Sequence, residues 1–188
     1  MTDEELVERQ MGRKPRGFVR VATRCPLGLP ETIVTKPVML KGDATDRRER
    51  VEPFPTVFWL TCPGAVRAVS ELEARGWVRR LQERLARDPM AFEAHLDAAR
   101  SYADYRVSLL SPGEASHLAK EHPRQYKVIA CSGVGGVLGR SGDAGVKCLH
   151  AHYADYLARG VNPIGKWVRE LLTGTARSSS ASAFPAPE

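Results

Sequence analysis

Short runs of β-branched and apolar residues mark the first third of the chain. These runs predict strands at 18–22, 31–35 and 56–61. The last run is bounded by a proline on each side and has the strongest strand composition, so it is expected in the middle of the sheet. A similar apolar run at 125–130 predicts a further strand that returns the chain to the sheet.

From residue 63 onward the apolar positions recur three and four apart, which is typical of amphipathic helices. Helices are predicted to begin at Pro63, Trp77 and Asp88, the last being the longest, with two more in the C-terminal part of the chain. Cys62 is expected near the N-cap of the first of these, since a proline is tolerated at the first helical position. Asn162 is expected to cap the last helix.

This pattern predicts an α+β fold in which a small, mainly antiparallel sheet is covered by several helices. The length of 188 residues, 43% of them hydrophobic, suffices for one core and is short for two. A single domain is therefore expected over residues 1–173. Residues 41–55 are rich in charge and are expected to be an exposed insertion or loop, and 174–188, rich in Ser, Ala and Pro, a disordered tail.

The apolar runs fall far short of the roughly 20 residues that span a bilayer, so no membrane partner is expected. The first residues are acidic, with Thr2 three positions before Glu5, and predict a capped helix rather than a leader. A cytoplasmic location follows as the expectation. Disulfides are not expected there, because cytosolic thiols stay reduced.

The formal net charge of +6 is unevenly spread along the chain. A basic segment without an intervening acidic residue comprises Arg9, Arg13, Lys14, Arg16, Arg20 and Arg24. A solvated surface is one interpretation, and an anionic partner such as a phosphate or a nucleic acid is the other. The solvated surface is preferred, since no aromatic residues interleave with the charges as a stacking platform.

A glycine-rich segment, with six glycines between Gly133 and Gly145, leads into Cys148, His150 and His152. Glycine lets the backbone approach a ligand closely, and amides at a helix start favour an anion. The residues proposed to bind such a ligand are Gly133, Gly135, Gly136, Lys147, Arg24 and Arg13. For Arg13, Arg24 and Lys147 the alternative is ordinary surface charge.

Three cysteines, Cys25, Cys62 and Cys148, lie where a predicted element begins or ends, and such junctions converge readily in a fold. With His150 or His152 they would complete the four Cys and His ligands of a zinc site. The spacing is not that of a paired Cys-x-x-Cys module. Burial as a small apolar side chain is the alternative for each cysteine and the preferred one for Cys131. His95, His117 and His122 are expected on the surface.

A second interpretation needs no metal. Cys148 or Cys62 at a helix start would be a reactive thiolate, with His150 or His152 as the general base. The glycine-rich amides would then bind a phosphate or an oxyanion. Neither a Walker motif nor a Cys-x5-Arg phosphate loop is present.

Several of these motifs together resemble a known family, the domain of unknown function 501. They are Arg24-Cys25-Pro26, Phe54 to Pro63, Gly135-Gly136, Val146 to His152 and Asn162-Pro-Ile-Gly165. The resemblance implies that Cys25, Cys62, Cys148 and His150 form the characteristic polar set, and implies little about activity because the family is uncharacterised.

The leading hypothesis is thus a metal-binding protein that holds zinc, or iron, through Cys25, Cys62, Cys148 and His150, structurally or for hydrolysis. The alternative is a metal-free enzyme with Cys148 or Cys62 as nucleophile and His152 among the candidate bases. A basic nucleic-acid-binding or adaptor module ranks third. The sequence leaves open whether the protein is an enzyme.

Overall fold

The computed structural model describes residues 1–43, 46–134 and 145–174, and only the backbone between residues 40 and 50. Its central sheet is antiparallel, with the strand order β1 (Phe18–Arg24), β2 (Pro30–Thr35) and β5 (Phe58–Leu60). β2 therefore lies in the middle. The prediction that 56–61 is the central strand is wrong: only three residues of β5 pair with β2, and the chain then turns into a helix.

A second sheet is the hairpin of β3 (Val38–Asp43) and β4 (Asp46–Pro53). Val38 pairs with Pro53 and Met39 with Glu52. Most of segment 41–55, expected as an exposed insertion or loop, is therefore strand. Buried Val38 packs against Leu118 and Ile129, so this hairpin has an apolar face that the charge-rich sequence hides.

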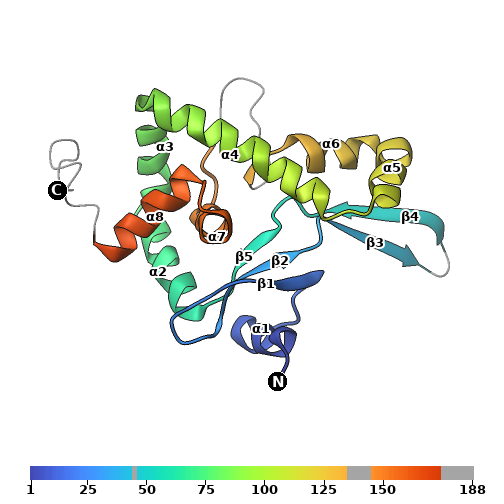
Figure 1. Cartoon of the computed structure of the whole chain (residues 1–188), viewed down its shortest axis with the longest axis horizontal. Helices are drawn as coiled ribbons and strands as arrows, with labels where there is room; N and C mark the ends of the chain where they lie inside the picture. The colour runs from blue at the N-terminus through green and yellow to red at the C-terminus, as the bar shows by residue number, and fades with distance from the viewer. Residues whose placement is uncertain (44–45, 135–144, 175–188) are drawn as a thin grey trace.

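Helices make up most of the rest of the described chain (Figure 1). They are α1 (Asp3–Met11), α2 (Pro63–Ala74), α3 (Trp77–Arg87), α4 (Pro89–Ser108), α5 (Pro112–Glu121), α6 (Pro123–Cys131), α7 (Leu149–Arg159) and α8 (Pro163–Thr173). The predicted capping box of Thr2 and Glu5 is confirmed, as are Cys62 at the N-cap of α2 and Asn162 at that of α8. The α+β class is thus confirmed.

The predicted strand at 125–130 is wrong, because these residues belong to α6. Pro123 stands at its first turn, where a missing N–H costs nothing. Ile129 is fully buried against Val38 and Leu118, while Val128 is 38% exposed. An apolar run of three or four residues does not distinguish a strand from a helix, and here tertiary packing decides. Cys131, expected to be buried, is exposed at the end of α6.

The molecule is elongated, with α2, α3 and α8 at one end and α5, α6 and the hairpin at the other (Figure 1). α4 runs along both parts. One core cluster joins α2, α3, α7 and α8, and a second joins the sheet to α4 and α7. α7 thus contacts both the helical end and the central sheet, and it positions the candidate site.

α7 and α8 approach each other closely at Gly165, which is buried. A Cβ atom built there would lie 2.2 Å from the carbonyl oxygen of His152 and 2.3 Å from the Cβ of Tyr156. Only glycine fits, because real Cβ atoms do not come within 3.0 Å of such neighbours. The requirement fixes the crossing of these two helices.

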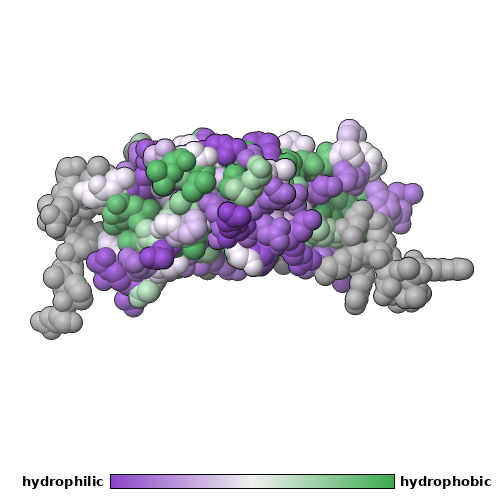
Figure 2. Space-filling model, turned by 90° about the horizontal axis from the view of Figure 1, so that it is seen from below, coloured by the Kyte–Doolittle hydropathy of each residue, from purple (hydrophilic) through white to green (hydrophobic). Residues whose placement is uncertain are grey.

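The surface seen from the side of α1 is hydrophilic around its middle, with separate hydrophobic areas toward either end (Figure 2). Among the helices of the described residues, none has the length and apolar character to cross a membrane.

Candidate functional site

Glu73, Cys148 and His150 meet where the last turn of α2 contacts the start of α7. Each offers one ligand atom, and these atoms all lie within 4.8 Å of one another. Cys148 is the N-cap of α7 and His150 lies in its first turn. All three residues are partly exposed, so the group is open to solvent. Among the described residues it is the group of His, Cys, Asp and Glu side chains that meets the geometry of a metal site.

Both oxygens of Glu73 are engaged. Oε1 accepts a hydrogen bond of 2.6 Å from the backbone N–H of Leu149, while Oε2 lies 3.3 Å from Nδ1 of His150. A carboxylate at the first amides of a helix is stabilised by those donors and by the helix dipole. Glu73 therefore caps α7 from outside the helix, since Cys148 makes no side-chain cap.

The His150 ring is oriented by its Nε2 atom. This atom lies 3.2 Å from the carbonyl oxygen of Val66 and 3.2 Å from Oγ of Ser70. A carbonyl only accepts, so the proton belongs on Nε2, and Nδ1 is turned toward Glu73 and toward Sγ of Cys148 at 4.0 Å. The hydrogen bond with Cys148, followed by the Glu73 carboxylate and the Val66 carbonyl, raises the pKa of His150 to about 9, against partial burial.

Two of the four predicted metal ligands, Cys148 and His150, thus lie together, and Cys25 and Cys62 are not in that group. Cys25 lies in the turn between β1 and β2, where its N–H donates to Leu29 at 2.9 Å. Cys62 precedes α2. Glu73 was missed as a ligand, although its position four residues after the buried Val69 was a signal for a carboxylate on the inner side of α2.

His152, the alternative partner of Cys148, lies in the core instead. It is 2% exposed, and its Nδ1 accepts from Nδ2 of Asn162 at 3.1 Å. Burial, with a smaller contribution from nearby His95, lowers the pKa of His152 to about 3. The two rings lie 5.6 Å apart between centroids. The prediction that His95 is on the surface is wrong, since it is 6% exposed.

Three of the six basic residues in the N-terminal segment form ion pairs with acidic residues from elsewhere in the described chain. Arg24 donates to both carboxylate oxygens of Asp3, at 2.7 and 2.8 Å. Lys14 lies 3.8 Å from Glu4, and Arg16 lies 3.1 Å from Glu52. Arg13 packs over the ring of Trp59. Lys147 is exposed beside Cys148. Gly135 and Gly136 lie outside the described residues.

Arg106 is a buried residue that the sequence did not single out. Its guanidinium donates to the carbonyl oxygens of Ile129 and Pro55, each at 2.6 Å, and to those of Ser132 and Gly133. Desolvation lowers its pKa. Arg106 thereby holds the chain where the glycine-rich segment begins. At the other end, Val146 N–H donates to Oε1 of Gln82 at 2.6 Å.

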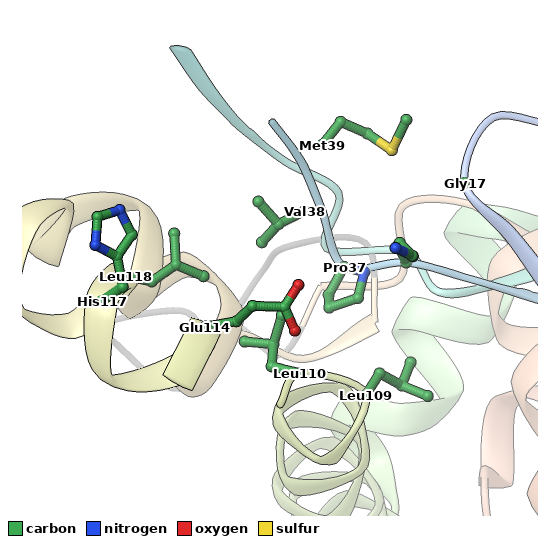
Figure 3. Close-up of a pocket in the computed structure, with 10 residues that line it drawn as sticks. Gly17, Pro37, Val38, Met39, Leu109, Leu110, Glu114, His117 and Leu118 are labelled. Atoms are coloured by element: carbon green, nitrogen blue, oxygen red, sulfur yellow. The ribbon is translucent and has the colours of Figure 1, made fainter. Parts of the chain in front are cut away.

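A cavity of about 380 Å³ opens far from this group, between the start of β3 and the corner of α4 and α5. Figure 3 shows Leu109, Leu110, Pro37 and Val38 around the Glu114 carboxylate. None of the predicted metal or catalytic residues lines it.

The described fold is an α+β protein with a Glu, Cys and His group suited to a metal ion. Residues 21–170 match the model of a family described as a protein of unknown function (DUF501). The chain belongs to this family, which confirms the resemblance seen in its motifs. No curated protein and no solved structure matches the chain.

Proposed function

We propose that this protein binds a zinc ion through Glu73, Cys148 and His150. The observation that carries the proposal is the convergence of a carboxylate oxygen, a sulfur and an imidazole nitrogen within 4.8 Å of one another. Zinc accepts all three ligand types, and a mixed set of this kind is more typical of zinc than of magnesium or calcium, which prefer oxygen ligands alone.

The hydrogen bonds around His150 support this proposal. A metal-bound histidine usually donates its other ring N–H to a carbonyl or a carboxylate, and the Val66 carbonyl occupies that place at Nε2. Nδ1 faces a carboxylate and a thiol, so a positive charge is favoured between them. A proton supplies that charge at neutral pH, and a zinc ion would replace it.

The number of ligands favours a hydrolytic site over a closed structural one. Structural zinc is usually held by four protein ligands, whereas catalytic zinc keeps three and an open position for water. The side chains of His150 and Glu73 are 26% and 29% exposed, which leaves room for water. Zinc in such a site lowers the pKa of bound water and polarises a substrate carbonyl or phosphoryl group. Cys62 lies at the other end of α2 from Glu73, so it is not a further ligand of this ion, and Cys25 is likewise outside the group.

A second candidate function is favoured by the contact of Cys148 with His150. A thiol 4.0 Å from Nδ1 of an imidazole whose pKa is raised to about 9 is suited to a thiolate and imidazolium pair. The helix start at Cys148 adds to the stabilisation of a thiolate. Such a thiolate would attack an acyl or phosphoryl group, and the His150 imidazolium would protonate the leaving group.

Elemental analysis of protein purified without a tag tests the first proposal. We expect one zinc per chain in the parent protein and in Cys131→Ser, and a loss of most of it in Glu73→Gln, Cys148→Ser and His150→Gln. Zinc that persists in these variants and disappears in Cys25→Ser and Cys62→Ser would contradict the assignment. Iron in place of zinc would overturn only the identity of the metal.

The same preparations test the second candidate. Metal-free protein in which iodoacetamide alkylates Cys148 much faster than exposed Cys131 at pH 7, with the difference lost in His150→Gln, would support the thiolate. Metal-free protein with equal alkylation rates at the two cysteines would contradict both functions.

A further inference from the structure

The helix α3 carries an excess of positive charge on one side. Its eleven residues include four arginines and one glutamate. Arg80, Arg84 and Arg87 are spaced by four and three residues, so they lie on the same side of the helix. Glu83 lies 3.9 Å from Arg79, and it is also three residues from Arg80 and four from Arg87, so it reduces the positive charge on this side without removing it. Within the described part of the chain, no carboxylate forms an ion pair with Arg80, Arg84 or Arg87.

Two of these arginines are held against tryptophan rings. The guanidinium carbon of Arg84 lies 4.0 Å from the ring centroid of Trp167, which belongs to α8 and is 6% exposed. That of Arg80 lies 5.1 Å from the ring centroid of Trp77. Stacking uses the flat face of a guanidinium and leaves its in-plane N–H groups for a ligand. An arginine that is already oriented loses less conformational entropy when it binds an anion.

This surface differs from the basic N-terminal segment, although both are rich in arginine. There, Arg24, Arg16 and Lys14 are matched by the carboxylates of Asp3, Glu52 and Glu4. On α3, Arg79 is matched by Glu83, whereas Arg80, Arg84 and Arg87 have no ion pair within the described part of the chain. The side formed by Arg80, Arg84 and Arg87, which we call the α3 arginine face, is therefore better suited to an external anion.

We propose that the α3 arginine face binds the phosphate backbone of a nucleic acid. Arg80 and Arg87 are about 10 Å apart along the helix axis at 1.5 Å per residue. One strand of a duplex carries about three phosphates over that length, at roughly 3.4 Å each. The arginine face is thus long enough to reach several phosphates of one strand, and arginine is the side chain best shaped for phosphate.

The binding is expected to be independent of base sequence. The ring of Trp167 is buried and is covered by Arg84, so it is not available to stack on a base. Contacts to phosphates alone position a protein on nucleic acid and do not read its sequence.

This inference does not depend on the metal site. Gln82, which holds Val146 near Cys148, lies two residues from both Arg80 and Arg84. Residues two apart on a helix do not share a side. Loss of nucleic-acid binding and loss of zinc are therefore expected from different substitutions.

Fluorescence anisotropy with a labelled 20-base-pair DNA duplex tests the proposal. We expect the logarithm of the affinity to fall with the logarithm of the salt concentration with a slope of about −3, near −0.9 per neutralised phosphate. Arg80→Gln/Arg84→Gln/Arg87→Gln should weaken binding at least tenfold and bring the slope close to zero. The control Arg9→Gln/Arg124→Gln/Lys127→Gln removes the same charge from exposed sites elsewhere and should bind nearly as the parent does.

A single substitution and a fluorescence measurement distinguish loss of binding from loss of folding. Arg87→Gln, which leaves both tryptophan stacks intact, should fold normally and reduce the slope by about 1. Duplex binding should also change the tryptophan fluorescence of the parent. Absence of binding at low salt, an equal loss in the control, or competition by polyglutamate as strong as by unlabelled duplex would overturn the proposal, the last in favour of an acidic protein partner.

Discussion

The backbone N–H of Leu149 donates a hydrogen bond of 2.6 Å to Oε1 of Glu73. A side chain at the end of α2 thus caps α7, and its second oxygen faces His150. The candidate ligand Glu73 is therefore fixed before any metal binds. Preorganisation of this kind is what a metal site requires of its ligands.

Two substitutions of Glu73 distinguish the contribution of its hydrogen bond to α7 from that of its negative charge. Glu73→Ala removes the acceptor for Leu149 and should lower the free energy of unfolding by about 1 kcal/mol, the usual value of a helix cap. Glu73→Gln keeps a carbonyl oxygen and should lower it by less than half as much. Urea unfolding of both variants in EDTA checks this, and equal losses would contradict a capping role.

The stability of metal-free protein should depend on His150 above neutral pH. The folded pKa of about 9 lies above the ordinary value of 6.5, so the stabilisation is complete below pH 6.5 and disappears as the pH rises through 9. The urea midpoint should thus fall between pH 6.5 and pH 9 in the parent protein. His150→Gln should flatten this dependence, and an unchanged slope would contradict the raised pKa.

His95 and His152 should make the folded protein less stable as the pH falls below neutral, whereas His150 does so as the pH rises. Burial lowers the pKa of both, and that of His152 to about 3, so the unfolded chain binds more protons below pH 6.5. Stability should therefore fall as the pH drops from 6.5 toward 3. His95→Phe removes one titrating ring in a position where Nδ1 has no hydrogen-bond partner among the described residues. This variant should lose less stability between pH 7 and pH 5 than the parent does.

Gly165→Ala should be strongly destabilising even though alanine favours a helix. The new Cβ would lie 2.2 Å from the carbonyl oxygen of His152, so α7 and α8 would have to separate, at a cost of about 2 kcal/mol or more. Gly113→Ala is the matched control, because a Cβ at Gly113 in α5 meets nothing within 4 Å. We expect it to be neutral or to stabilise by up to about 1 kcal/mol. Thermal unfolding compares the two.

Arg106→Met should cost about 3 kcal/mol or more. The substitution keeps an apolar side chain in the core but leaves the carbonyl oxygens of Ile129, Pro55 and Ser132 without their donor. Arg106→Lys retains a charge but not the geometry that reaches all of them, so it should be only partly better. Parent-like stability of Arg106→Met in urea would contradict this role.

Structural features that depend on residues close together in the sequence were predicted correctly. The caps at Thr2 and Asn162 and the proline start of α2 depend only on local chemistry. The identity of α6 was missed because burial of Ile129 against Val38 and Leu118 decides it. Val38 comes from a hairpin whose sequence suggested a loop, and Leu118 comes from α5.

In the candidate site, too, contacts between residues close in the sequence were predictable and contacts between distant segments were not. Cys148 and His150 are two residues apart, so their proximity could be read from the sequence. Glu73 belongs to a helix much earlier in the chain, and only the packing of α2 against α7 brings it to them. Choosing between His150 and His152 also needed the fold, because Asn162 and His95 hold His152 in the core.

Arg106 and Gln82 both belong to helices that precede the glycine-rich segment. Arg106 donates hydrogen bonds to the carbonyl oxygens of Ser132 and Gly133, and Oε1 of Gln82 accepts one from the backbone N–H of Val146. Both ends of the glycine-rich segment are therefore held in place, one by α4 and the other by α3. The contacts that position Glu73 and His150 lie outside this segment, so a change in its length is expected to leave the ligand atoms where they are.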